Sequence, residues 1–151
     1  MTIAVDFDGT IVEHAYPKIG KPIPFALEVL RKLHQEEHHI LILWTMREGR
    51  LLQEAVDYCA KNDVHFYACN KNYPEEEFKE GDSRKIAVDI YIDDRNIGGL
   101  LDWGVIYKIL QSGCNSIQNS GFHADNIRTA GRKNWLIRLG EAWERSKNKH
   151  Y

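Results

Sequence analysis

The amino-acid sequence predicts an α/β fold, a three-layer α/β/α sandwich around a parallel sheet of about five strands. Two observations lead to this prediction. Short, nearly continuous apolar runs recur along the first 110 residues, as expected of strands that are covered on both faces. Helical patterns of apolar residues lie between these runs, and this alternation favours right-handed crossovers between parallel strands.

Five runs are expected to form the strands. Each is short and rich in Val, Ile or Tyr, and polar or turn-forming residues follow most of them. The runs are TIAVDF (2–7), HILILW (39–44), VHFYA (64–68), AVDIYI (87–92) and VIYKIL (105–110).

Two segments between the runs are expected to be helices. Segment 25–37 follows Pro22 and Pro24, which stand where a proline costs no helical hydrogen bond. Segment 49–61 precedes the third run. The apolar residues that recur at helical spacing are Ala26, Val29, Leu30 and Leu33 in the first segment, and Leu52, Ala55, Val56 and Cys59 in the second.

The sequence changes character after about residue 111. QSGCNSIQNSG is polar and nearly uncharged, which predicts a loop, and RKNWLIRLGEAWERSK then places Trp135, Leu139 and Trp143 on one helical face. We therefore divide the chain into a core domain over 1–110 and an extension over 111–151. The amphipathic helix could dock on its own domain, form a homo-oligomer contact, or cover a neighbour's site, because exposed tryptophans need a partner.

Composition excludes several classes of protein. The chain has 151 residues, enough for one domain, and its formal charge of −2 gives no general reason to bind nucleic acid or a membrane. No run is long enough to span a bilayer, and no signal peptide is recognised. The cysteines, Cys59, Cys69 and Cys114, show no metal-ligand spacing and cannot all pair. We expect them to be reduced and buried, as in a cytoplasmic protein.

Acidic and hydroxyl side chains follow three of the predicted strands. Asp6 and Asp8 end the first, Thr45 follows the second, and Asp93 and Asp94 follow the fourth. Ligands of parallel α/β sheets bind outside the carboxyl ends of the strands, so these side chains should converge. Four carboxylates need a cation, and oxygen ligands of this kind favour Mg²⁺. Because Mg²⁺ readily takes phosphate as a further ligand, the site points to phosphate chemistry.

The positions suggest a role for each residue. Asp6 is the expected nucleophile, forming an aspartyl-phosphate, and Asp8 can protonate the leaving oxygen and then activate water. The backbone carbonyl of Asp8 could also bind the metal. Gly9 leaves room for a phosphoryl group beside backbone N–H groups, and Thr45 can donate a hydrogen bond to it. Lys85 can neutralise the charge that Asp6 and the phosphoryl group share.

The residues after the fourth predicted strand complete the expected metal set of Asp6, Asp8, Asp93 and Asp94. Asp94 is expected to bind Mg²⁺ directly, and Asp93 to bind it or to orient its waters.

DFDGT, LILWT, a lysine and IYIDD, in this order, resemble the four motifs of the haloacid dehalogenase superfamily, in its phosphatase branch. The resemblance covers the core domain and implies a Mg²⁺-dependent phosphomonoester hydrolase. It implies that Asp6 is the nucleophile, Asp8 the acid and base, and Asp6, Asp8 and Asp94 the metal set, with Thr45 and Lys85 in the roles given above. Asp8 favours phosphoryl transfer, because members that cleave carbon–halogen bonds lack this second aspartate.

Two lysines compete for the third motif. Family members often carry this lysine on a helix well before the fourth motif, whereas here seven residues separate Lys85 from Asp93. Lys85 would therefore reach the site from the turn before the strand. Lys71, in CNKNYPEEE after the third strand, is the alternative.

The motif spacing leaves no room for the cap domain that many members carry. Such an open site suits a macromolecular end, a protein phosphoester, or a small substrate enclosed by a partner subunit. Arg47 could fork onto a second phosphate or a carboxylate, or pair with a neighbouring glutamate. The residues expected at the rim are Glu13, His14, Tyr16, Arg47, Asn70, Lys71 and Asn72.

Two other functions remain open. A phospho-accepting signalling module uses similar residues, but its phosphorylated aspartate ends the third strand, where this chain has ACNKN. A degenerate interaction protein would keep the fold without activity, although the filled motif positions argue against it. The substrate itself is not identified by the sequence.

Overall fold

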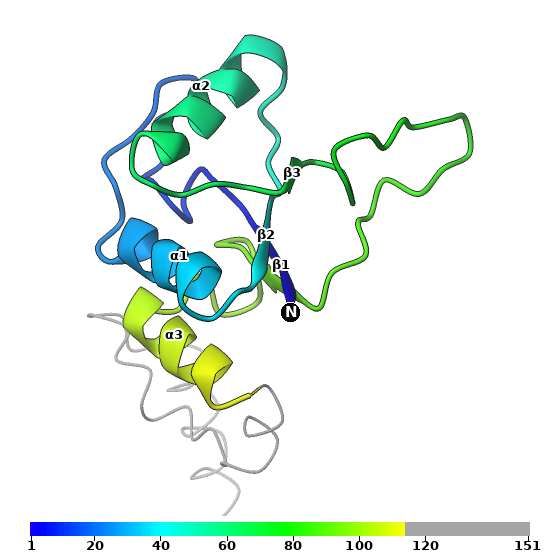
Figure 1. Cartoon of the computed structure of the whole chain (residues 1–151). Helices are drawn as coiled ribbons and strands as arrows, with labels where there is room; N and C mark the ends of the chain where they lie inside the picture. The colour runs from blue at the N-terminus through cyan, green and yellow to red at the C-terminus, as the bar shows by residue number, and fades with distance from the viewer. Residues whose placement is uncertain (114–151) are drawn as a thin grey trace, which may run out of the picture. The chain divides into compact units, whose positions relative to one another are not determined.

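A parallel sheet of four strands lies at the centre of the computed structural model, which describes residues 1–113 (Figure 1). The strands are β1 (Thr2–Val5), β2 (Ile40–Leu43), β3 (Ala68–Cys69) and β4 (Ile90–Ile92), in the order β3-β2-β1-β4. β1 pairs with both β2 and β4. The predicted parallel α/β fold is confirmed, and the helix predicted in the extension lies outside the described residues.

Three helices pack against one face of this sheet. They are α1 (Ala26–Gln35), α2 (Gly49–Ala60) and α3 (Trp103–Gln111). α1 and α2 confirm the helices predicted over 25–37 and 49–61. Alternate residues of a strand point to opposite faces, so the main core takes every second residue of β1 and β2. Its members include Ile3, Val5, Leu41, Leu43, Leu30, Leu33, Ala55, Cys59, Trp103 and Ile106.

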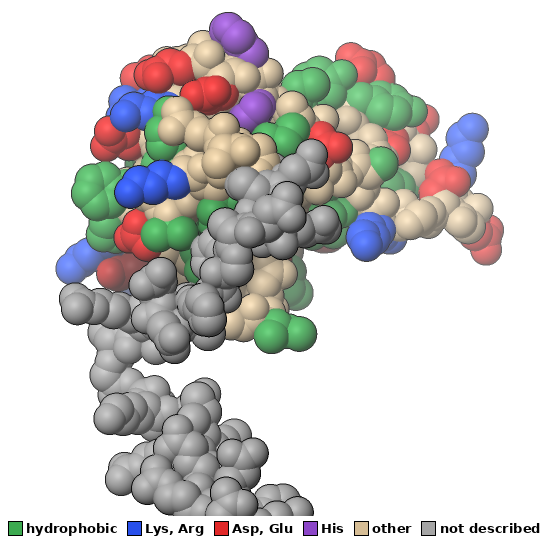
Figure 2. Space-filling view, turned by 90° about the horizontal axis from the view of Figure 1, so that it is seen from below, with side chains coloured by type: hydrophobic (Ala, Val, Ile, Leu, Met, Phe, Trp, Pro, Cys, Tyr) green, Lys and Arg blue, Asp and Glu red, His purple; other side chains and the backbone are tan. Residues whose placement is uncertain are grey.

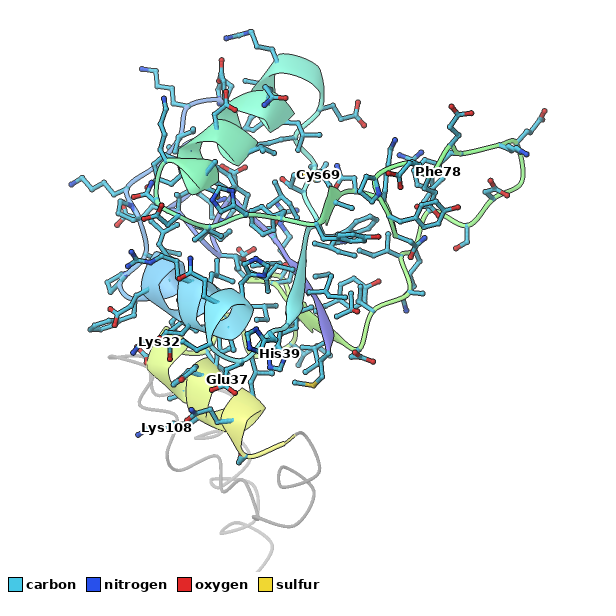
Figure 3. The ribbon with its side chains drawn as sticks, viewed as in Figure 1. Lys32, Glu37, His39, Cys69, Phe78 and Lys108 are labelled. Atoms are coloured by element: carbon cyan, nitrogen blue, oxygen red, sulfur yellow. The ribbon has the colours of Figure 1, made fainter. Side chains whose placement is uncertain are left out.

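The opposite face of the sheet is covered by a loop. Ala4 of β1 and Ile42 of β2 are buried there against Ile86, which belongs to the long connection between β3 and β4. Figures 1 and 3 show this connection extending away from the helices, with Phe78 far from the sheet. Within residues 1–113 we therefore find helices on one face only, and the three-layer expectation is wrong for this part of the chain.

The fifth predicted strand is also wrong, because 105–110 lies inside α3. Trp103, Ile106 and Leu110 recur at helical spacing and are buried, whereas Val105 is 38% exposed. Asp102 caps the helix by accepting a hydrogen bond from the Gly104 N–H. The third strand exists but starts later than expected, at Ala68 rather than at residue 64.

Helix α3 contacts the rest of the described chain through hydrogen bonds and a cation–ring contact near its two ends. Near its C-terminus, Gln111 donates to Glu37, and Lys32 of α1 lies 5.7 Å from the centre of the Tyr107 ring (Figure 3). At its first residue, the buried Trp103 Nε1 donates to the backbone carbonyl of Thr10, 3.0 Å away. The second contact ties the helix to the loop after β1.

The surface and the thiols give a few further facts about the described residues. On the face seen in Figure 2, acidic and basic side chains are interspersed, and we see no broad patch of one charge there. No helix among residues 1–113 is long and apolar enough to cross a bilayer. Cys59 is buried and unpaired, and its burial raises the thiol pKa to about 12.

We predict that Trp103→Phe destabilises the fold by about 1–3 kcal/mol, because the Thr10 carbonyl loses its N–H donor in a buried place. Equilibrium unfolding in urea measures the change. Val105→Ala, on the exposed side of the same helix, is the control and should cost clearly less. Equal losses in the two variants would contradict the role of this hydrogen bond.

Candidate functional site

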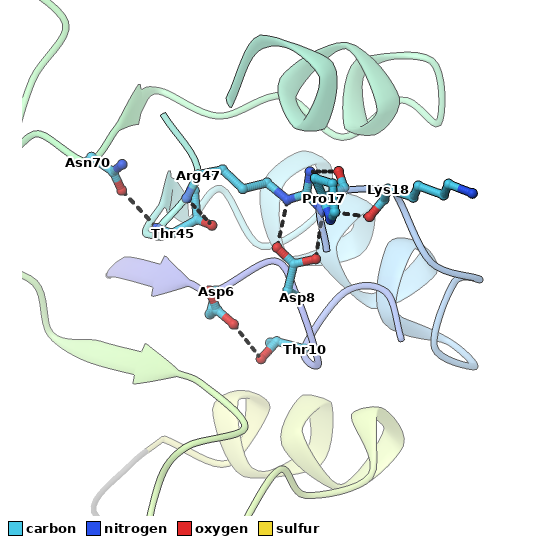
Figure 4. A network of polar contacts seen from close by, with 8 residues as sticks. All are labelled: Asp6, Asp8, Thr10, Pro17, Lys18, Thr45, Arg47 and Asn70. Atoms are coloured by element: carbon cyan, nitrogen blue, oxygen red, sulfur yellow. Dashed lines mark hydrogen bonds and ion pairs between the residues drawn. The ribbon is translucent and has the colours of Figure 1, made fainter. Parts of the chain in front are cut away.

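The candidate site lies where the strands end. Asp6 follows β1, Thr45 follows β2, and Asn70 follows β3 (Figure 4). Asp93 and Asp94 follow β4. Since all four strands run parallel, their carboxyl ends meet at one edge, which is where α/β sheets bind ligands.

Three carboxylates gather at this edge. One oxygen from each of Asp6, Asp93 and Asp94 lies within 4.8 Å of the others. The pKa of Asp6 is raised to about 6, first because burial disfavours its charged form and then because Asp93, Asp94 and Asp8 repel that charge. The cluster therefore holds more negative charge than its surroundings neutralise.

Asp94 gives a direct sign of a missing partner. Its Oδ1 is buried and has no hydrogen-bond partner, which is rare for a carboxylate oxygen. Its Oδ2 lies 2.9 Å from His14 Nε2. A hard divalent cation prefers carboxylate oxygens and would satisfy Oδ1, so the donor set of Asp6, Asp93 and Asp94 fits such an ion.

Thr10 connects the two acidic segments. Its side chain is fully buried, and its Oγ1 donates to Asp6 Oδ2 at 3.4 Å and accepts from the Asp94 N–H at 3.0 Å. The Trp103 contact holds the carbonyl of the same residue. The sequence reasoning missed this role, although Thr10 is the last letter of the DFDGT motif.

Gly9 has a structural role that the sequence did not indicate. Its N–H donates to the Val12 carbonyl at 2.6 Å. Its φ is +93°, and a Cβ built there would lie 2.3 Å from His14 Nε2 and 2.7 Å from Asp94 Oδ2. The space that glycine leaves therefore admits Asp94 and His14, and the room for a phosphoryl group beside Gly9 stays a prediction.

Asp8 forms a two-pronged ion pair with Arg47. Arg47 Nε lies 2.6 Å from Asp8 Oδ2, and Arg47 Nη2 lies 2.7 Å from Asp8 Oδ1 (Figure 4). The Arg47 side chain is 0% exposed and also donates to the carbonyls of Pro17 and Lys18. The hydrogen bonds that Arg47 donates to the Asp8 carboxylate raise the pKa of Arg47 above its usual value.

This pair corrects two predictions. Arg47 was expected to bind substrate or to pair with a nearby glutamate, but its guanidinium is buried and occupied by Asp8. The side chain of Asp8 faces Arg47, so it does not join the metal cluster of Asp6, Asp93 and Asp94. The backbone carbonyl of Asp8 as a metal ligand stays a prediction.

A cleft of about 480 Å³ opens over the acidic cluster. Thr45 lies in its wall, and the Thr45 Oγ1 accepts a hydrogen bond from the Arg47 N–H at 3.2 Å. Asn70 Oδ1 accepts from the Thr45 N–H and holds the turn in place. The lining residues are Asp6, Asp8, His14, Tyr16, Trp44, Thr45, Met46, Asp93 and Arg95.

Neither candidate lysine lines the cleft. Lys85 is exposed, and its Nζ lies 6.0 Å from the centre of the Tyr91 ring, which in turn contacts Trp44 of the cleft wall. Lys71 is half-buried outside the lining. Arg95 does line the cleft, and the sequence reasoning missed it although it directly follows the paired aspartates.

Of the other rim residues, His14 and Tyr16 line the cleft. Asn72 turns away from it: its side chain bonds Glu76 and the Ala87 N–H within the long loop. Glu13 lies outside the lining as well.

The chain is similar to a conserved protein from Bacteroides thetaiotaomicron whose structure has been solved. The two share 60% sequence identity, and the match covers 74% of this chain and 90% of that one, with a TM-score of 0.69. The chain belongs to the same family as that protein. The similarity shows the family of the chain and gives no activity for it. A scan of family models and a search of curated proteins found no match.

We predict that Arg47→Met destabilises the fold by about 3 kcal/mol or more, because Asp8 is left largely buried without its cation. Urea unfolding gives the measurement. Arg50→Met removes an exposed helical ion pair with Glu54 and serves as the matched control, with an expected loss below about 1 kcal/mol. Wild-type stability in Arg47→Met would show that the pair is not part of the folded core.

We predict that Asp6→Asn stabilises the protein in EDTA, and more so as pH rises. The folded-state pKa of Asp6 is about 6 against an ordinary 3.8, so the folded chain holds the extra proton between these values. Wild-type stability therefore falls as pH rises from about 4 through 6, whereas the variant carries no such charge. The gap should reach about 2 kcal/mol at pH 7, after allowance for solvent screening.

Thermal melts of both proteins between pH 4 and pH 7.5 test this. Asp57→Asn removes an exposed carboxylate on α2 and is the control for the loss of one charge away from the acidic cluster. A constant difference between Asp6→Asn and wild type across the range would contradict the raised pKa.

Proposed function

We propose that this chain is a Mg²⁺-dependent phosphomonoester hydrolase, a capless member of the haloacid dehalogenase superfamily that works through an aspartyl-phosphate on Asp6. The observation that carries the proposal is the meeting of Asp6 with Asp93 and Asp94, two segments far apart in sequence, around the unpartnered Asp94 Oδ1. Carboxylates crowd in this way at a cost, which a bound cation would offset.

The chemistry divides into two displacements. An oxygen of the Asp6 carboxylate attacks phosphorus, the bond from phosphorus to the leaving oxygen breaks, and that oxygen takes a proton to leave as an alcohol. Water then attacks phosphorus and loses a proton. The bond from phosphorus to the Asp6 oxygen breaks, so inorganic phosphate leaves and the Asp6 carboxylate is restored. Bound Mg²⁺, held by Asp6, Asp93 and Asp94, would offset the negative charge of the carboxylates and the phosphoryl group.

Some residues near Asp6 are free to take part in these steps, whereas Asp8 is held by another contact. Asp8 lines the cleft and is our candidate for carrying the proton, but both its oxygens accept hydrogen bonds from Arg47, so one must be released for the transfer. The Thr45 hydroxyl lies in the cleft wall with its hydrogen available for a phosphoryl oxygen. Arg95 can neutralise phosphoryl charge from the cleft, and the role of Lys85 stays a prediction.

We predict that phosphate is released from a generic aryl phosphate only with Mg²⁺ present, and that Asp6→Asn abolishes this release. The loss should be at least about a thousandfold, because no other described side chain replaces the nucleophile. Release of inorganic phosphate is the readout. Asp57→Asn, remote from the cleft, should keep wild-type rates.

The metal needs a readout of its own. Mg²⁺ should raise the melting temperature of wild type, and Asp94→Asn should lose this shift because it removes a carboxylate from the donor set. An aryl phosphate left intact by wild type with Mg²⁺, together with no shift in melting, would overturn the proposal. A phosphoryl-aspartate that persisted without turnover would indicate the signalling module instead.

A further inference from the structure

Three of the residues that line the cleft differ from the acidic ones. Tyr16, Trp44 and Met46 line the same space as Asp6, and we call these three residues the aromatic wall. Tyr16 is 62% exposed and Met46 is 85% exposed. Large apolar side chains placed next to a charged site remain open to solvent here, although burial would stabilise them.

The two rings are held in place by their neighbours. Trp44 directly follows β2, its N–H donates to the Val5 carbonyl at 2.9 Å, and its ring meets the Tyr91 ring edge-on with centres 6.5 Å apart. Tyr16 lies over the Arg47 guanidinium, 5.4 Å from its ring centre. Arg47 is itself fixed by Asp8, so the Tyr16 ring lies over a buried ion pair.

Resting on the proposed function, we propose that the substrate is a small organic phosphate whose leaving group carries a planar aromatic ring close to the phosphate. The phosphoryl group lies at Asp6, and the ring packs against Tyr16, Trp44 and Met46. Flat π surfaces and a polarizable thioether favour a planar ring over a saturated, hydroxyl-rich group of similar size. A nucleoside monophosphate and a simple arylalkyl phosphate both carry this chemistry.

The size of the cleft supports a small molecule. About 480 Å³ falls within the range of sites that enclose ligands of a few hundred daltons, roughly 300–1,000 Å³. Trp44 and Met46 flank Thr45 in the chain, and all three line the same cleft as Asp6. A ring within a few bonds of the phosphorus can therefore reach the aromatic wall.

Matched substrates test the inference without changing the reacting bond. Adenosine 5′-monophosphate and ribose 5-phosphate share the same phosphorylated carbon and differ in the base. Benzyl phosphate and cyclohexylmethyl phosphate are both primary esters and differ in ring planarity. With Mg²⁺, we expect kcat/KM to be about tenfold higher for the aromatic member of at least one pair, as one stacked ring supplies. The pair that shows the effect identifies the source of the ring.

Substitutions of single tyrosines test which residue causes the preference for the aromatic substrate. Tyr16→Ala should lower the aromatic preference, measured as the ratio of kcat/KM between the two members of a pair, several-fold, because it removes one of the aromatic rings that line the cleft. Tyr67→Ala is the matched control: Tyr67 is 52% exposed and lies outside the cleft lining, so its removal should leave the preference intact.

Binding distinguishes failure of this inference from failure of the proposed function. Calorimetry on Asp6→Asn should show about tenfold tighter binding of the aromatic member than of its partner, whether or not wild type hydrolyses either compound. Equal affinities and equal kcat/KM within both pairs would overturn the aromatic substrate while leaving the phosphatase intact. Tighter binding of the aromatic member without any hydrolysis would support the aromatic wall and overturn the phosphatase.

Discussion

Mutual repulsion among three carboxylates at the ends of β1 and β4 is the constraint on which the rest of the site depends. Parallel pairing of these strands brings Asp6 beside Asp93 and Asp94, and burial then weakens the screening that water would provide. Thr10 and His14 offset part of this charge through hydrogen bonds. Burial of Asp6, together with the charge that remains on its neighbours, raises the pKa of Asp6 to about 6. The unbalanced charge is also what makes the cluster fit a cation.

Two buried supports hold the acidic segments in this costly arrangement. On one side Trp103 of α3 fixes Thr10, which bonds both Asp6 and the backbone of Asp94. On the other side Arg47 fixes Asp8. The helix that the sequence suggested as a strand therefore has a direct structural link to the site. These two supports therefore hold the carboxylates close together although the carboxylates repel one another.

Local sequence patterns predicted most of the helices and strands. Helical spacing placed α1 and α2 within one or two residues of their ends, and the apolar runs placed β1, β2 and β4. The run over 105–110 failed because its apolar residues fill both the buried and the half-exposed sides of a helix, which hides the helical period. Asp102, a helix cap, was the signal that could have corrected it.

By itself, the sequence determined which residues stand at the ends of strands, because strand patterns and the acidic motifs are local features of the chain. Partners depend on side-chain direction and on loops, so only the tertiary structure decided them. In the folded chain, Asp8 faces Arg47, and the Asp94 side chain lies beside Gly9. Lys85 lies over the Tyr91 ring and not in the cleft lining. The physical reason is that a buried ion pair is chosen by desolvation and geometry in three dimensions, which residue order does not record.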